Sequence, residues 1–182
     1  MAIQVDGGLI RAAALFAAKA DVRAYLNAVE VERRAGRVSV TASDGHTAFL
    51  ALVSATQDGD DARFAIPTCV AAKVPDALVS VAGDRVGAVL VDATATDCRV
   101  MREMIESVIP ADRVDGFAAS LDARYLERVG KAFALLAKGE KYGAPVRCSV
   151  ARKGPAVNPH VFRSSRELRG ADVTALVMPM LD

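Results

Sequence analysis

The sequence predicts an α+β fold made of three copies of one unit, each a strand, a helix and then three strands. Short segments rich in β-branched residues are separated by turn signals such as Ala35-Gly36 and Asp44-Gly45. Each group of segments follows a stretch with helical spacing, and the order returns after about sixty residues. With 182 residues, 52% of them hydrophobic, the chain can bury a substantial core.

The first unit is predicted from residue 3 to residue 54. A short strand over 3–5 precedes the turn at Gly7-Gly8, and an Ala-rich helix follows over 9–19. Three β-compatible segments then form a meander, over 30–34, 37–42 and 47–54.

The second unit repeats this order. A strand over 63–66 leads into a short helix that Pro67-Thr68 opens and that runs to about residue 74. Three further strands are predicted, over 78–82, 85–93 and 96–102. Segment 101–116, with its charges, Pro110 and Gly116, is predicted to be a linker.

The third unit contains the most informative helix. A strand over 117–121 precedes a helix that Asp122 caps and that runs to about residue 138. Strands are predicted over 145–153, 156–165 and 171–180. The apolar positions of the helix recur at helical spacing, and its basic residues gather away from them. The apolar positions are Leu126, Val129, Phe133 and Leu136, and the basic ones are Arg124, Arg128, Lys131 and Lys138. Such a stripe is either a solvated helix surface or a functional basic face.

Composition excludes several classes of protein. The 23 basic and 22 acidic residues nearly cancel, which argues against a uniformly basic protein but permits a local basic face. Cys69, Cys98 and Cys148 suggest neither a disulfide framework nor a metal site and are predicted to be buried thiols, and no cofactor is expected. The sequence lacks signal-peptide and membrane-spanning patterns, so we expect a cytoplasmic protein.

A catalytic site is not expected. Asp44, His46 and Cys69 could be combined into a hydrolytic set, but neither a nucleophile elbow nor a suitable spacing accompanies them. The apolar segment from Leu176 to Met180 indicates binding instead. Its two methionines around a proline suggest a pocket wall rather than a simple terminal strand.

Four short strings, taken together and in order, resemble the bacterial sliding clamp, the beta subunit of DNA polymerase III. They are Asp21 to Asn27, Ala42 to His46, Val108 to Pro110 and Val177 to Met180. In that family the strings read close to Asp-Val-Arg-Tyr-Tyr-Leu-Asn, Ala-Thr-Asp-Gly-His-Arg-Leu, Val-Leu-Pro and Val-Met-Pro-Met. The resemblance implies a DNA-clamp-like fold of about one and a half clamp domains, a truncated and divergent form. Residues 1–112 resemble the middle domain, 113–116 a linker, and 117–182 the second half of the last domain.

The resemblance also implies a peptide-binding groove. In the family this groove takes short motifs of polymerases, clamp loaders and repair proteins. The matching positions here are Leu26, Ser43, Gly45, His46, Val108, Asp122, Tyr125, Leu176, Val177, Met178, Pro179 and Met180. Without the resemblance, the apolar members are equally compatible with ordinary core. Four departures fall near these positions, namely Thr47-Ala48 for Arg-Leu, Asp122 for Asn, Ala24 for Tyr, and Arg102-Glu103 for Phe-Pro.

Sliding clamps surround duplex DNA with helices that touch phosphates without reading bases. The resemblance therefore implies that Arg124, Arg128, Lys131 and Lys138 contact duplex DNA in a replication or repair processivity factor that is not an enzyme. A chain of three units would complete a twelve-unit ring as a tetramer, and pairing of two orphan third units would give a two-fold dimer. The alternative is a clamp-like scaffold or decoy that binds clamp-motif peptides without encircling DNA.

Overall fold

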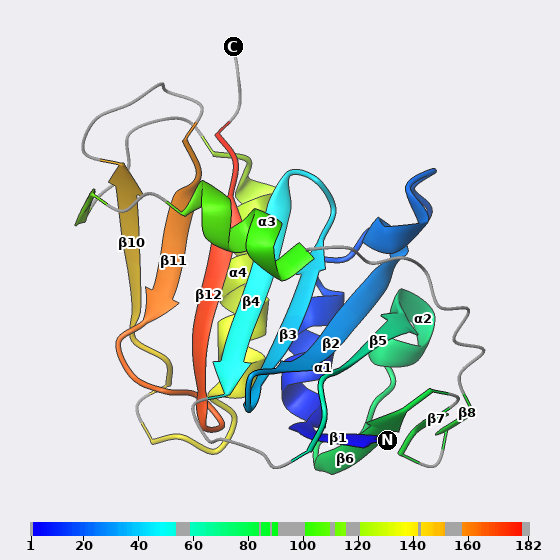
Figure 1. Cartoon of the computed structure of the whole chain (residues 1–182). Helices are drawn as coiled ribbons and strands as arrows, with labels where there is room; N and C mark the ends of the chain where they lie inside the picture. The colour runs from blue at the N-terminus through cyan, green and yellow to red at the C-terminus, as the bar shows by residue number, and fades with distance from the viewer. Residues whose placement is uncertain are drawn as a thin grey trace.

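The computed structural model describes residues 2–53, 59–83, 85–87, 89–90, 101–109, 112–115, 121–141, 143–151 and 158–179. Within these residues the chain forms two antiparallel sheets and four α-helices (Figure 1). The larger sheet has eight strands in the order β5-β2-β3-β4-β12-β11-β10-β9, and the smaller has four in the order β1-β6-β7-β8. The elements are β1 (Ala2–Asp6), α1 (Gly7–Ala14), the 3-10 helix η1 (Ala24–Asn27), β2 (Ala28–Arg34), β3 (Arg37–Ser43), β4 (Thr47–Val53), β5 (Ala62–Pro67), α2 (Thr68–Ala71), β6 (Leu78–Ala82), β7 (Arg85–Val86), β8 (Val89–Leu90), α3 (Met101–Val108), β9 (Arg113–Asp115), α4 (Ala123–Leu136), β10 (Val146–Ala151), β11 (His160–Ser164) and β12 (Ala171–Val177).

The start of α1 is fixed by a cap and by a close backbone contact. The side chain of Asp6 accepts a hydrogen bond from the Gly8 backbone N–H at 2.7 Å. The Gly7 N–H donates to the Ala77 carbonyl oxygen at 2.8 Å. A Cβ atom at Gly7 would lie 2.1 Å from the Pro75 carbonyl oxygen, so only glycine fits there. This junction seats α1 against the segment that leads into β6.

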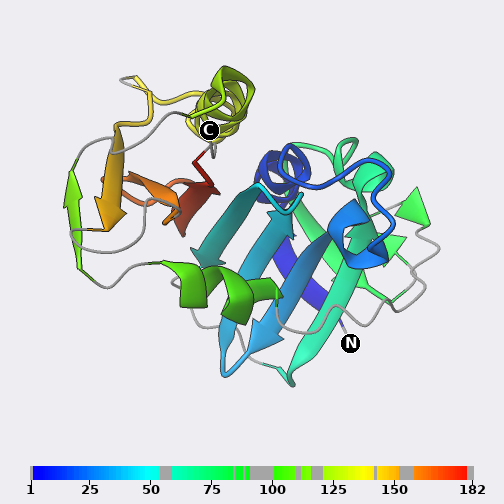
Figure 2. The same ribbon diagram turned by 90° about the horizontal axis from the view of Figure 1, so that it is seen from above.

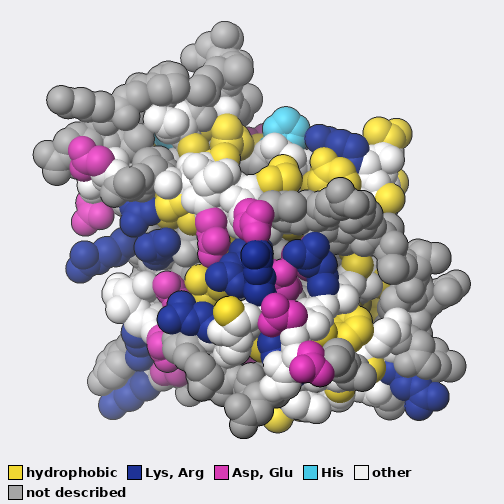
Figure 3. Space-filling view, viewed as in Figure 1, with side chains coloured by type: hydrophobic (Ala, Val, Ile, Leu, Met, Phe, Trp, Pro, Cys, Tyr) yellow, Lys and Arg dark blue, Asp and Glu magenta, His cyan; other side chains and the backbone are white. Residues whose placement is uncertain are grey.

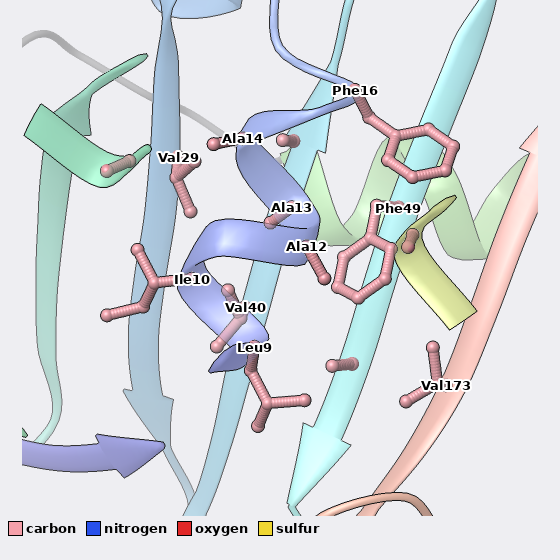
Figure 4. Close-up of a cluster of buried hydrophobic side chains, with 14 of the residues drawn as sticks. Leu9, Ile10, Ala12, Ala13, Ala14, Phe16, Val29, Val40, Phe49 and Val173 are labelled. Atoms are coloured by element: carbon pink, nitrogen blue, oxygen red, sulfur yellow. The ribbon is translucent and has the colours of Figure 1, made fainter. Parts of the chain in front are cut away.

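The eight-stranded sheet has two different faces. Helices α1 and α4 lie against one face, which we call the helix face, and α3 lies against the other, which we call the α3 face (Figure 2). Because strand side chains alternate between faces, each central strand contributes one set of residues to each. On the helix face small and aromatic side chains fill the space beneath α1 (Figure 4). Phe16 and Phe49 are both fully buried there, with ring centroids 5.4 Å apart.

The α3 face is chemically mixed. A small apolar cluster joins α3 to the sheet and consists of Ala48, Leu50, Met101, Ile105, Val161 and Leu176. Beside it lie strand positions with polar or charged side chains that are nonetheless buried. They are Glu30 and Glu32 of β2, Ser39 and Thr41 of β3, and Thr174 of β12.

Strand β12 joins the first and third predicted units into one sheet. It pairs with β4 from Thr47↔Val177 to Val53↔Ala171 and with β11 on its other side. Its alternate residues Val173, Ala175 and Val177 enter the helix-face core. The first and third units therefore share one continuous hydrogen-bonded sheet.

The predicted order of elements is largely present, with α2 ending at Ala71 and β12 at Val177, each three residues before its predicted end, with the 3-10 helix η1 unpredicted, and with larger differences elsewhere. Segment 101–116, predicted as a linker and partly as the strand over 96–102, contains α3 and then β9, because Met101 and Ile105 bury against the sheet. The predicted helix over 9–19 ends at Ala14, and the predicted strand over 85–93 is broken into β7 and β8 by Gly87 at φ +60°. Positions 96–100 and 117–120 lie outside the described residues.

Two expectations about side chains also change. Cys69, predicted to be buried, is exposed, whereas Cys148 is half-buried and its pKa is raised to about 11, mainly by burial and also by Asp115. Cys98 lies outside the described residues. On α4, Val129, Phe133 and Leu136 are buried as predicted, while Leu126 in the first turn is partly exposed. No helix in the described residues is long and apolar enough to cross a membrane.

Candidate peptide-binding pocket

A pocket of about 300 Å³ lies between α3, the turn that joins β3 to β4, and the segment after β12. On this side of the molecule, apolar side chains gather beside an exposed histidine, while acidic and basic side chains intermingle over α3 (Figure 3). The residues that line the pocket are Arg23, Tyr25, Leu26, Ser43, Gly45, His46, Thr47, Ala48, Met101, Met104, Ile105, Val108, Leu176 and Met178.

The β3–β4 turn is held by its own side chains. Asp44 Oδ1 accepts hydrogen bonds from the backbone N–H of His46 at 3.0 Å and of Thr47 at 2.7 Å, and from Thr47 Oγ1 at 2.9 Å. Ser43 Oγ donates to the Thr47 carbonyl oxygen at 2.8 Å and accepts from the Gly45 N–H at 3.0 Å. Gly45 has φ +90°, a conformation that a side chain would strain. The turn thus presents an ordered backbone to the pocket.

The segment after β12 is tied to this turn. The Met178 N–H donates a hydrogen bond to the His46 carbonyl oxygen at 2.9 Å, which extends the pairing of β12 with β4 by one contact. Leu176, buried two residues earlier, points to the α3 face and forms part of the pocket wall. Leu176 and Met178 on one side, and the β3–β4 turn on the other, therefore form adjoining walls of the pocket.

Helix α3 supplies the opposite wall. Met101 and Ile105, one turn apart, are buried against the sheet and still reach the pocket. Met104 and Val108 line its mouth and are 54% and 47% exposed. Exposed apolar side chains beside a concave apolar surface are typical of a site that receives an apolar ligand.

Seven of the twelve residues predicted for the groove line this pocket, namely Leu26, Ser43, Gly45, His46, Val108, Leu176 and Met178. Tyr125 lies behind the turn, where its ring stacks on His46 with centroids 6.1 Å apart. Asp122 caps α4 by accepting from the Arg124 N–H at 2.8 Å. Val177 belongs to the helix-face core, and Pro179 is half-buried but does not line the pocket. Met180 lies outside the described residues.

Sequence reasoning missed the contribution of α3. Met101, Met104 and Ile105 line the pocket but stood in the segment predicted as a linker. Their spacing with Val108 follows a helical repeat, and this pattern could have identified an amphipathic helix. The charged residues of this segment, together with Pro110 and Gly116, obscured it because they suggest a loop.

The basic residues of α4 face a second, larger groove between α1 and α4, with a volume of about 1020 Å³. Arg124, Arg128 and Lys131 line it, and each is paired with a carboxylate of this chain. Arg124 pairs with Asp122 at 2.5 Å and lowers the pKa of that carboxyl, and Lys131 pairs with Glu127 at 2.7 Å. Arg128 pairs with Asp44, and Lys138 is exposed beyond the end of the helix.

The architecture is that of the sliding clamps of DNA polymerase III. The Pseudomonas aeruginosa DNA polymerase sliding clamp superposes with a TM-score of 0.61 at 15% identity, over 100% of this chain and 67% of that chain. The Bacillus subtilis sliding clamp gives 0.63 at 15% identity, covering 100% and 64%, and the Thermotoga maritima DNA polymerase III beta subunit gives 0.60 at 14%, covering 100% and 65%. The chain thus spans about two thirds of the length of these clamps. No protein-family model and no curated protein matches the sequence.

Proposed function

We propose that this chain is a sliding-clamp-like, non-enzymatic protein of DNA replication or repair that binds short peptide segments of partner proteins in the pocket beneath α3. The pocket carries the proposal. It joins residues from four separate parts of the chain, and seven of them stand at positions that the resemblance to clamps assigns to peptide binding. Polymerases, clamp loaders and repair proteins are the proposed class of partner.

The pocket chemistry suits a peptide with large apolar anchors. Met101, Met104 and Met178 are unbranched and can repack around side chains of different shape. Ala48 and Leu176 give the floor an aliphatic surface. The exposed backbone at Gly45 and the ring of His46 provide polar groups at the rim that can orient a peptide main chain.

Fluorescence anisotropy with a short labelled peptide that carries Leu and Phe anchors tests this function. The double variant Met104→Ala/Met178→Ala removes apolar surface from two walls, and we expect about tenfold weaker binding. Leu78→Ala is the matched control, because Leu78 is 71% exposed, lies on the smaller sheet and does not line the pocket. Equal affinity of the double variant and the control would reject the pocket as the binding site.

Encirclement of duplex DNA by an oligomer, as a tetrameric ring or a two-fold dimer, is the second part of the proposal. Two features support it: the clamp fold, and the sheet edges at β5 and β9, each of which pairs on one side only in the part of the chain that the structure describes. A ring that forms should be retained on circular DNA and released when the DNA is cut. A solution mass of one protomer would rule out a ring.

A clamp-like scaffold that binds peptides without encircling DNA is the second candidate. The ion pairs of Arg124, Arg128 and Lys131 with carboxylates of the same chain favour it, because paired cations attract phosphates less strongly than unpaired ones. The variant Arg124→Gln/Lys131→Gln separates the candidates. A DNA-binding face predicts lower affinity and a flatter salt dependence, and unchanged binding supports the scaffold.

A further inference from the structure

We propose that Arg128 is a positioning residue of the peptide pocket, which holds the β3–β4 turn from the side opposite to the peptide. This inference rests on the proposed peptide binding and assigns to Arg128 a role other than the phosphate contact that the sequence suggested. The inference follows from two observations: the β3–β4 turn lies between the pocket and the groove, and the guanidinium group of Arg128 contacts this turn.

The β3–β4 turn separates the pocket beneath α3 from the groove between α1 and α4. Ser43, Gly45, His46 and Thr47 line the pocket. Asp44, in the middle of the same turn, lines the groove on the other side. A group that binds Asp44 from the groove therefore acts on the backbone that faces the pocket.

The guanidinium of Arg128 touches this turn at several points. Its Nη1 donates to Asp44 Oδ2 and lies 3.4 Å from Thr47 Oγ1. Its central carbon lies 5.4 Å from the ring centroid of Tyr125, the ring that stacks on His46 with an interplanar angle of 12°. Arg128 thus contacts the turn directly through Asp44 and indirectly through Tyr125.

These contacts leave both carboxylate oxygens of Asp44 occupied. Oδ1 accepts from the N–H groups of His46 and Thr47 and from Thr47 Oγ1, while Oδ2 takes the charge-assisted bond from Arg128. Partial burial raises the pKa of Asp44, but the backbone and side-chain hydrogen bonds together lower it below its ordinary value. Loss of Arg128 would leave a half-buried carboxylate with one unpaired oxygen, which would then compete for the donors that shape the turn.

The other cations of α4 that line the groove are paired locally. Arg124 binds Asp122, two residues before it, and Lys131 binds Glu127 on the same helix. Arg128 bridges α4 to a turn 84 residues earlier in the chain. This difference makes Arg124→Gln a matched control, since it removes the same kind of charge from the same helix without touching the turn.

Two measurements on the full chain test the inference. Amide hydrogen exchange, followed by NMR without ligand, reports on the His46 and Thr47 N–H groups. We expect Arg128→Gln to speed their exchange roughly three- to tenfold and to leave the amides of β10 and β11 unchanged. The labelled Leu/Phe peptide should bind this variant roughly three- to tenfold more weakly.

Arg124→Gln should change neither quantity, and Arg128→Lys should recover part of both, because an ammonium can pair with Asp44 but offers fewer donors. If Arg128→Gln is too unstable to measure, the comparison of Arg128→Lys with the unmutated chain tests the inference instead. Unchanged exchange of His46 and Thr47 together with unchanged affinity in Arg128→Gln overturns the inference. Absence of peptide binding by the unmutated chain instead overturns the proposed function, so the two failures are distinguishable.

Discussion

The two faces of the eight-stranded sheet use the same strands for different purposes. On the helix face, alternate residues of β3, β4 and β12 meet α1 and α4 in a continuous apolar core (Figure 4). On the α3 face, the intervening residues of the same strands meet one short helix, a small apolar cluster and several buried polar groups. The comparison indicates that the helix face contributes most of the stability of the fold. The α3 face buries less apolar surface, contributes less, and contains the pocket.

Buried polar groups without hydrogen bonds explain why the α3 face contributes less stability than the helix face. Among the described residues, no hydrogen-bond partner is present for either carboxylate oxygen of Glu30 or for the hydroxyls of Ser39 and Thr41. Burial of such unpaired polar groups costs free energy, whereas burial of the Val and Ala side chains on the helix face of the same strands does not. A face with these costs is expected to tolerate, and sometimes to gain from, substitutions that the other face does not accept.

The largest expected effect is on the helix face. Phe49→Ala removes a fully buried ring that packs against Phe16, and we expect a loss of about 3–5 kcal/mol in the free energy of unfolding, measured with urea. Met104→Ala on the α3 face should stay within about 0.5 kcal/mol of the unmutated chain because its side chain is half exposed. Similar losses in the two variants would remove the distinction between the faces.

A gain of intermediate size is expected from Glu30→Gln. Glu30 is 1% exposed, and burial raises its pKa from 4.5 to about 7, with Arg63 opposing and Glu32 reinforcing the change. Between about pH 4.5 and pH 7, Glu30 therefore stays protonated in the folded chain but is ionised in the unfolded chain. The corresponding stability is complete below about pH 4.5 and is lost as the pH rises through about 7. At pH 8 the variant should be more stable by on the order of 1–3 kcal/mol.

Urea denaturation between pH 5 and pH 8 measures this effect, and the advantage of Glu30→Gln should shrink towards the acid end. Glu103→Gln is the control, because Glu103 is exposed and pairs with Arg34 at 2.5 Å on the surface. An equal pH dependence in both variants would show that burial of Glu30 does not produce it.

The smallest effect is expected on the solvent side of α4. Lys131→Gln removes an exposed pair with Glu127 one helical turn away, and the free energy of unfolding should change by about 0.5 kcal/mol or less. Thermal unfolding at low and high salt provides the measurement. A loss above about 1 kcal/mol would show that Lys131 makes interactions beyond its pair with Glu127.

Local pattern predicted most of the strands and the long helix. The β-compatible segments, the turn signals at Ala35-Gly36 and Asp44-Gly45, and the capping residue Asp122 each act within a few residues of the chain. Helix α3 was missed, although its apolar spacing is helical, because the charges of its segment suggested a loop and because the apolar cluster that holds it forms only on folding. Its own eight residues are too few to be stable alone.

The candidate site shows the same division between local and long-range information. The turn from Ser43 to Thr47 and the tail around Met178 were recognised as strings, and the fold brings them together. Arg128 and Asp44 are 84 positions apart, and the sequence around either residue does not predict their contact. The basic stripe on α4 therefore suggested a free cationic surface, whereas its residues are largely paired.

The position of β12 has a consequence for the order in which the chain can fold during its synthesis. Strands β2, β3 and β4 emerge from the ribosome early, but the partner of β4 on its second side emerges only with residues 171–177. Until then, β4 presents an unpaired edge of apolar residues to other growing chains. We therefore expect truncated chains that end before residue 171 to aggregate or to recruit chaperones, and chains that include β12 to pair it with β4 and to do neither.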